Sequence, residues 1–138
     1  MVLERTKQIL KNHEGHEYCG NGVSYHVFLY PIDAGTNPEE AIRTFLLSEI
    51  YDDDKDYVQN HCHLALMENG LQEIENLLKE WHISPSDTEK ILMELKEHHA
   101  EIYSFGKDHS YFLGSVSECP RYIHVGNEWY LLEFCLYD

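Results

Sequence analysis

The sequence has few basic residues, and this shortage excludes several kinds of partner. Lysine and arginine number 10 against 25 aspartate plus glutamate, which gives a formal charge of −15 at pH 7. A small domain usually carries a net charge with a magnitude of about 2 to 8. Because a polyanionic surface repels phosphate groups, we expect neither direct nucleic-acid binding nor binding to an anionic membrane.

Long apolar segments are also missing. No run of about 18 apolar residues occurs, so no membrane-spanning helix is expected. The first residues, Met-Val-Leu-Glu-Arg-Thr-Lys, lack the apolar run of a secretory signal. None of the four cysteines belongs to a Cys-x-x-Cys pair. Together these features predict a cytoplasmic protein with reduced thiols.

Motifs for catalysis are absent from the sequence as well. No serine lies in a Gly-x-Ser-x-Gly context, as the nucleophile of an α/β-hydrolase would. The glycines Gly20 and Gly22 precede an expected strand, whereas a phosphate-binding loop precedes a helix. Pairs of carboxylates do not indicate general acid–base catalysis here, because such pairs are common in any chain with 25 acids. We therefore expect a binding protein and assign no catalytic residue.

The composition that remains is typical of one folded domain. The 138 residues are 43% hydrophobic, which is enough to build a core without disulfides or metals. No repeat or Pro/Gly/Ser linker divides the chain, so residues 1–138 should form a single α+β domain.

Apolar periodicity and capping residues predict the order of the elements. Apolar residues at helical spacing favour helices over residues 3–13, 37–50, 71–81 and 84–106. Alternation and β-branched or aromatic content favour strands over residues 23–30, 57–67, 110–116, 121–125 and 128–136. We predict an antiparallel or mixed sheet with about four helices on one face and a C-terminal three-stranded antiparallel meander.

Ten histidines raise the alternative of a zinc protein with possible hydrolytic activity. If residues 57–67 form a strand, His61 and His63 point to the same face, an arrangement that metal sites use. A third ligand would come from the loop between His13 and Cys19. The candidate metal ligands are therefore His13, His16, Cys19, His61 and His63. The favoured explanation is a histidine-rich surface without a metal, and His99 is expected to lie in the core.

The most distinctive cluster combines acids with aromatic residues. Four aspartates lie between two tyrosines, and tyrosine is a favoured anchor at protein interfaces. Acids around aromatic anchors suit a partner rich in lysine and arginine, because opposite charges accelerate association. The candidate partner-binding residues are Tyr51, Asp52, Asp53, Asp54, Asp56 and Tyr57.

In size, charge and aromatic content the chain resembles the small acidic immunity proteins of bacterial toxin systems. That resemblance implies an antitoxin-type inhibitor that neutralises a basic toxin or nuclease domain. Another alternative is a nucleic-acid mimic, whose acids would follow the spacing of phosphates and block a DNA-binding protein. The apolar last strand also leaves open a homo-oligomer.

Overall fold

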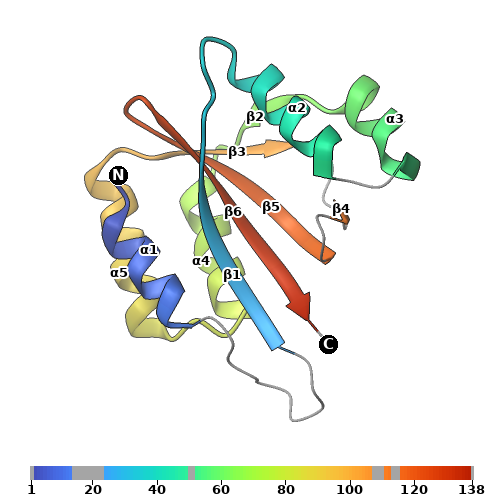
Figure 1. Cartoon of the computed structure of the whole chain (residues 1–138). Helices are drawn as coiled ribbons and strands as arrows, with labels where there is room; N and C mark the ends of the chain where they lie inside the picture. Colours follow the sequence, from blue (N-terminus) through green and yellow to red (C-terminus); the bar gives the residue numbers. More distant parts are fainter. Residues whose placement is uncertain (1, 14–23, 50–51, 107–110, 113–115, 138) are drawn as a thin grey trace.

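The structure is a computed structural model that describes residues 2–13, 24–49, 52–106, 111–112 and 116–137. Within these ranges lie five helices and six strands (Figure 1). The helices are α1 Glu4–Asn12, α2 Pro38–Glu49, α3 Asp52–His61, α4 Gly70–Glu80 and α5 Pro85–Glu97. The strands are β1 Ser24–Ile32, β2 Leu64–Leu66, β3 Glu101–Phe105, β4 Tyr111–Phe112, β5 Val116–Val125 and β6 Glu128–Tyr137. No helix in the described ranges is long and apolar enough to cross a membrane.

The strands form one antiparallel sheet, which confirms the α+β class. Its order is β1-β6-β5-β3-β2, and β4 pairs with β5 beside this path. The C-terminal meander is confirmed, since β4, β5 and β6 are antiparallel neighbours in chain order. Strand β1 continues through Pro31, where we expected it to stop. Proline is tolerated there because β1 is an edge strand in this order, and its outer side needs no ladder hydrogen bond.

Helices cover both faces of the sheet, so the prediction of helices on one face is wrong. Residues Tyr130, Leu132 and Phe134 of β6 pack into a core with α1, α4 and α5. The alternate residues Trp129 and Leu131 pack into a second core with α2 and α3. Figure 1 shows the two helix groups on either side of the strands. Both faces of β6 are therefore covered by helices.

The predicted strand over residues 57–67 is wrong in its first half. Residues 52–61 form α3, and only Leu64–Leu66 pair as β2. Val58 and Cys62 are both fully buried, and their spacing of four is that of a helix face. The aspartates that we expected to follow a helix instead begin one, where negative charge is favoured by the helix dipole.

The last predicted helix is too long. Helix α5 ends at Glu97, and His99 adopts a positive φ of 53° before β3 begins. His99 is exposed rather than buried in the core. Residues 101–105, Glu-Ile-Tyr-Ser-Phe, then form β3, in which Ile102 is buried in the first core and Phe105 in the second, on the opposite face. The apolar spacing of Leu95 and Ile102 fits a helix, but the two residues belong to different elements of the same core.

One buried carboxylate from α5 holds the first turn of α1. Glu94 is only 3% exposed and accepts hydrogen bonds from the backbone N–H of Arg5 (3.1 Å) and of Thr6 (2.9 Å). The Arg5 Nε also donates to Glu94, at 3.2 Å. Burial raises the pKa of Glu94, but these hydrogen bonds outweigh it, so the pKa lies below its usual value.

Candidate functional site

The predicted acidic site lies on α3. Asp52, Asp53 and Asp54 form its first turn, although their side chains and the whole of Tyr51 lie outside the described residues. Asp56 is exposed and accepts a hydrogen bond from Asn60 at 2.9 Å. The helix carries four aspartates against one lysine in ten residues. The structure thus arranges these acids along one short helix rather than in a loop.

A hollow of about 610 Å³ lies at the C-terminal end of α3, and we call it the α3–β2 hollow. Tyr57 and His61, one helical turn apart, form one wall with their rings 5.8 Å apart. The remaining lining residues are His63, Ala65, Ser104 and Gly106. One predicted partner-binding tyrosine and two predicted metal ligands therefore lie at the same place.

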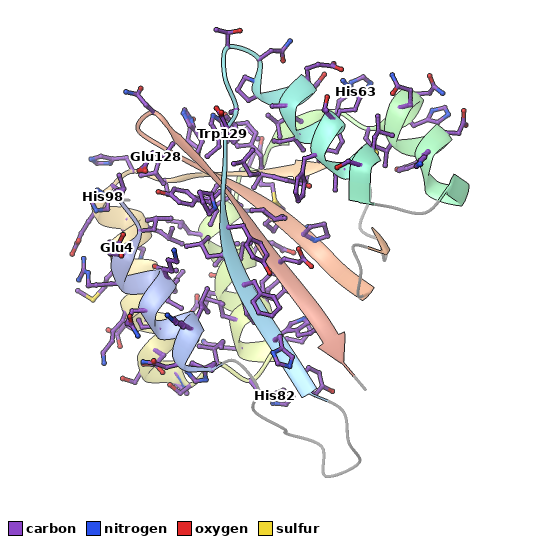
Figure 2. The ribbon with its side chains drawn as sticks, viewed as in Figure 1. Glu4, His63, His82, His98, Glu128 and Trp129 are labelled. Carbon is purple, nitrogen blue, oxygen red and sulfur yellow. The ribbon has the colours of Figure 1, made fainter. Side chains whose placement is uncertain are left out.

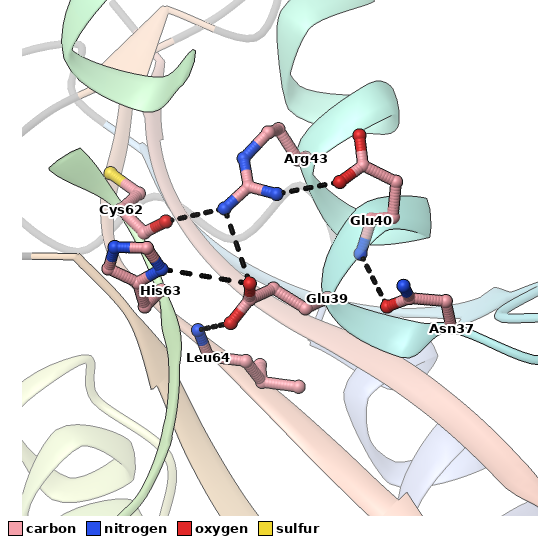
Figure 3. A network of polar contacts seen from close by, with 7 residues as sticks. All are labelled: Asn37, Glu39, Glu40, Arg43, Cys62, His63 and Leu64. Atoms are coloured by element: carbon pink, nitrogen blue, oxygen red, sulfur yellow. Dashed lines mark hydrogen bonds and ion pairs between the residues drawn. The ribbon is translucent and has the colours of Figure 1, made fainter. Parts of the chain in front are cut away.

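A network of charged residues connects α2 to the short segment that joins α3 to β2 (Figure 3). Arg43 of α2 is 7% exposed, and its guanidinium donates to Cys62 O (2.7 Å), to Glu40 (2.8 Å) and to Glu39 (3.4 Å). The same guanidinium lies 5.5 Å from the centre of the Phe105 ring. Sequence reasoning missed this network, although the spacing of Glu39 and Glu40 before Arg43 indicates ion pairs on a helix.

Glu39 connects this network to the edge of the sheet. It accepts the backbone N–H of Leu64 at 2.9 Å, and its other oxygen lies 3.6 Å from His63 Nδ1. The Leu64 hydrogen bond is the main reason that the pKa of Glu39 is lowered, with Arg43 and His63 acting in the same direction against partial burial. The network therefore orients His63 at the margin of the α3–β2 hollow.

The same contact partly closes the edge strand β2. Met67 N–H donates to Ile102 O at 2.9 Å, so the backbone groups of residues 65 and 67 point toward β3. Leu64 and Leu66 then direct theirs toward the open edge. Because Glu39 takes the Leu64 donor, a strand added to this three-residue edge would lose one of its hydrogen bonds.

The proposed metal ligands do not all assemble. His13 lies at the end of α1, where its Nε2 is 2.9 Å from Asp87 of α5, on the opposite face of the sheet from α3. His61 and His63 share the α3–β2 hollow, although not as neighbours on a strand. His16 and Cys19 lie outside the described residues. Within the described residues, no three His, Cys, Asp or Glu side chains gather closely enough to hold a metal ion.

A second hollow, of about 590 Å³, lies beside the turn that joins β5 to β6, and we call it the hairpin hollow. One side is the loop that follows β1 and the other is the hairpin itself. Figure 2 shows Glu128 and Trp129 at this turn, beside the chain that leads from β1 to α2. The lining residues used below are Asp33, His124, Glu128 and Trp129. The Gly126-Asn127 turn was predicted from the sequence, but the approach of residues 31–35 was not.

Aromatic and acidic groups are combined in the hairpin hollow. The His124 ring stacks on Trp129 with centroids 4.5 Å apart and 16° between the planes. The Nδ1 atom of His124 is 2.9 Å from Glu101. Glu128 accepts the backbone N–H of Val2 at 3.1 Å. Burial, together with the hydrogen bond to Glu128, raises the pKa of Tyr130 to about 12.

Comparison with protein-family models, with curated proteins and with solved structures gives no match for this chain. The interpretation of both hollows therefore depends on their own residues and geometry.

Proposed function

We propose that this protein is an acidic binding module that occludes a cation-rich protein partner, as an immunity or antitoxin-type inhibitor does with a basic toxin or nuclease domain. The contact surface would be α3 together with the α3–β2 hollow. The observation that carries the proposal is that a helix with four aspartates and one lysine ends at a hollow lined by Tyr57 and His61.

The two parts of this surface have different roles in the proposal. Exposed carboxylates such as Asp56 attract a basic surface over long range and raise the association rate. The half-buried Tyr57 ring offers apolar area that loses little conformational freedom on binding, which is typical of an interface anchor. The Arg43 network supports both roles, because it holds α2, α3 and β2 in one arrangement before the partner binds. Less conformational freedom is then lost on binding.

The test begins with affinity capture of a cation-rich partner on the immobilised protein, followed by stopped-flow association kinetics with the purified partner. A variant that carries Asp52→Asn, Asp53→Asn, Asp54→Asn and Asp56→Asn removes four charges from α3. We expect its association rate at low ionic strength to fall by about tenfold or more, with a weaker dependence on salt.

A matched control separates the place of the charges from their number. Four glutamates that are exposed elsewhere are replaced by glutamine: Glu4, Glu68, Glu80 and Glu89. This control changes the net charge by the same amount, and we expect association to slow by less than about threefold. Equal rates for the two variants would show that α3 is not the contact surface. Failure to recover any cationic partner, with turnover of a small compound, would overturn the proposed function itself.

The zinc alternative has one supporting observation, which is that His61 and His63 line the same hollow. It predicts stoichiometric zinc in protein purified without a histidine tag, lost in the His61→Ala and His63→Ala variants. Elemental analysis with no bound metal would remove this alternative.

A further inference from the structure

We propose that the hairpin hollow is a binding site for one arginine side chain, presented by a partner protein. The hollow is separate from the acidic helix, because its residues come from β5, β6 and the loop after β1. It would therefore supply a second contact point, with a chemistry more specific than overall charge.

The shape of the hollow suits a planar cation. The stacked rings of His124 and Trp129 form a flat element of its wall, and the Tyr103 ring holds Trp129 from 5.0 Å. Trp129 is only 7% exposed, whereas the His124 side chain is 30% exposed, so the imidazole is the accessible layer of the stack. A guanidinium group stacks on such planar rings, whereas an ammonium group is compact and strongly hydrated.

The polar groups of the hollow accept hydrogen bonds. Asp33 is exposed on the loop side, and Glu128 is half-buried on the hairpin side. Glu128 is already positioned by the Val2 N–H and by the Tyr130 hydroxyl. The His124 Nδ1 atom lies 2.9 Å from Glu101, and this contact holds the imidazole in place. None of the described lining residues is a lysine or an arginine.

These groups match the five N–H donors of a guanidinium and its fixed planar geometry. Asp33 would neutralise the charge, Glu128 would add negative potential from the hairpin side while its carboxylate stays bound to Val2 and Tyr130, and the ring wall would contact the face of the guanidinium. An anionic ligand such as a nucleotide would meet two carboxylates and no cationic side chain among the described lining residues, so it is disfavoured. This inference rests on the proposed function in one respect: the arginine is presented by the cation-rich partner proposed above.

The test uses a small probe, so it does not require the partner. Nα-acetyl-L-arginine amide is titrated into the full chain, and binding is followed by two-dimensional ¹H–¹⁵N NMR. The Trp129 indole N–H and the Gly126 and Asn127 amides report on the hollow. The other tryptophan, Trp81, packs against Phe134 and Tyr25 in the core on the opposite face and is an internal reference.

We expect saturable shifts at Trp129, Gly126 and Asn127, with a dissociation constant of about 1 mM for so small a ligand and no shift at Trp81. The uncharged analogue Nα-acetyl-L-citrulline amide has nearly the same shape and should cause no saturable shift. The lysine analogue should bind more weakly than the arginine probe.

Two variants locate the interaction. Asp33→Asn removes one exposed carboxylate of the hollow and should weaken binding of the probe about threefold, as expected for a partly solvated charge pair. Glu89→Gln removes the same charge from an exposed position on α5, outside both proposed surfaces, and should leave the affinity unchanged. Glu128→Gln should weaken binding by a factor similar to that of Asp33→Asn, and its fold is checked by circular dichroism, because Glu128 also holds Val2.

Shifts of equal size with citrulline, or shifts confined to α3, would overturn the arginine site. In either case the kinetics of the α3 variants still decide the proposed function, so the two failures can be told apart. Conversely, a hollow that binds the arginine probe in a protein whose α3 variants associate normally would place the main contact at the hairpin.

Discussion

Glu94 offers the sharpest test of how this fold is held together. The substitution Glu94→Gln keeps the size of the side chain but removes its charge and one of its two acceptor oxygens. In the native protein those oxygens accept the backbone N–H groups of Arg5 and Thr6, which begin α1. The first turn of α1 has no other side-chain cap, since Leu3 precedes it.

The expected cost follows from the donors that lose their partner. The single oxygen of glutamine can accept one of the two backbone N–H groups, and the other is left in a buried place. An unsatisfied buried donor costs about 1 to 3 kcal/mol, and loss of a helix N-cap costs about 0.5 to 2 kcal/mol. The Arg5 side chain is 55% exposed and stays in water, so its ion pair adds little. We expect a loss of about 2 kcal/mol in the free energy of unfolding.

Urea denaturation followed by circular dichroism measures this loss, which should lower the midpoint by about 1 M. The matched control is Glu97→Gln, because Glu97 pairs with the same Arg5 but is half exposed. The control should change stability by less than about 0.5 kcal/mol. If both variants unfold at the same urea concentration, Glu94 is not the residue that anchors α1.

The dependence on pH gives an independent check of the same contact. The pKa of Glu94 is lower in the native state than its ordinary value of about 4.3. Its stabilisation is therefore fully present above that value and is lost as the pH falls through the native pKa. The difference between the native protein and Glu94→Gln should be constant near pH 7 and should shrink below about pH 4. A difference that grows in acid would contradict the assigned role.

Two further substitutions test the interior. Gly70→Ala would place a Cβ atom 2.5 Å from Ile102 Cβ, which cannot move without the backbone of β3. We therefore expect the free energy of unfolding, measured by urea denaturation, to fall by about 1 to 3 kcal/mol. An unchanged free energy of unfolding would show that α4 can shift away from β3 freely. Tyr122 is fully buried and its hydroxyl makes no hydrogen bond to any described residue, while burial and the nearby Glu133 raise its pKa. Tyr122→Phe should therefore be neutral or stabilise the protein by up to about 1 kcal/mol, whereas the control Tyr130→Phe, which loses contacts to Val2 and Glu128, should destabilise it. A Tyr122→Phe variant that unfolds well before the native protein would reveal a partner for this hydroxyl.

Local signals in the sequence predicted the parts of the fold that are determined by neighbouring residues. Asn37 accepts the Glu40 N–H and Ser84 accepts the Asp87 N–H, so both predicted helix starts are confirmed. The Gly126-Asn127 turn and the alternation on β6 follow from short-range turn chemistry and from the two-residue period of a strand. These features depend on residues a few positions apart.

Tertiary contacts decided the rest. Residues 57–61 suit a strand by composition, but burial of Val58 and of the following Cys62 in the core with α2 makes them the last turns of α3. The second helix layer, the contact of Arg43 with Cys62 and the hairpin hollow join residues from 19 to about 100 positions apart, and no local pattern encodes such pairs. The sequence by itself determined the charge, the class and most element starts. Only the folded chain decided which acids, rings and histidines lie together, because side-chain burial depends on the whole packing arrangement.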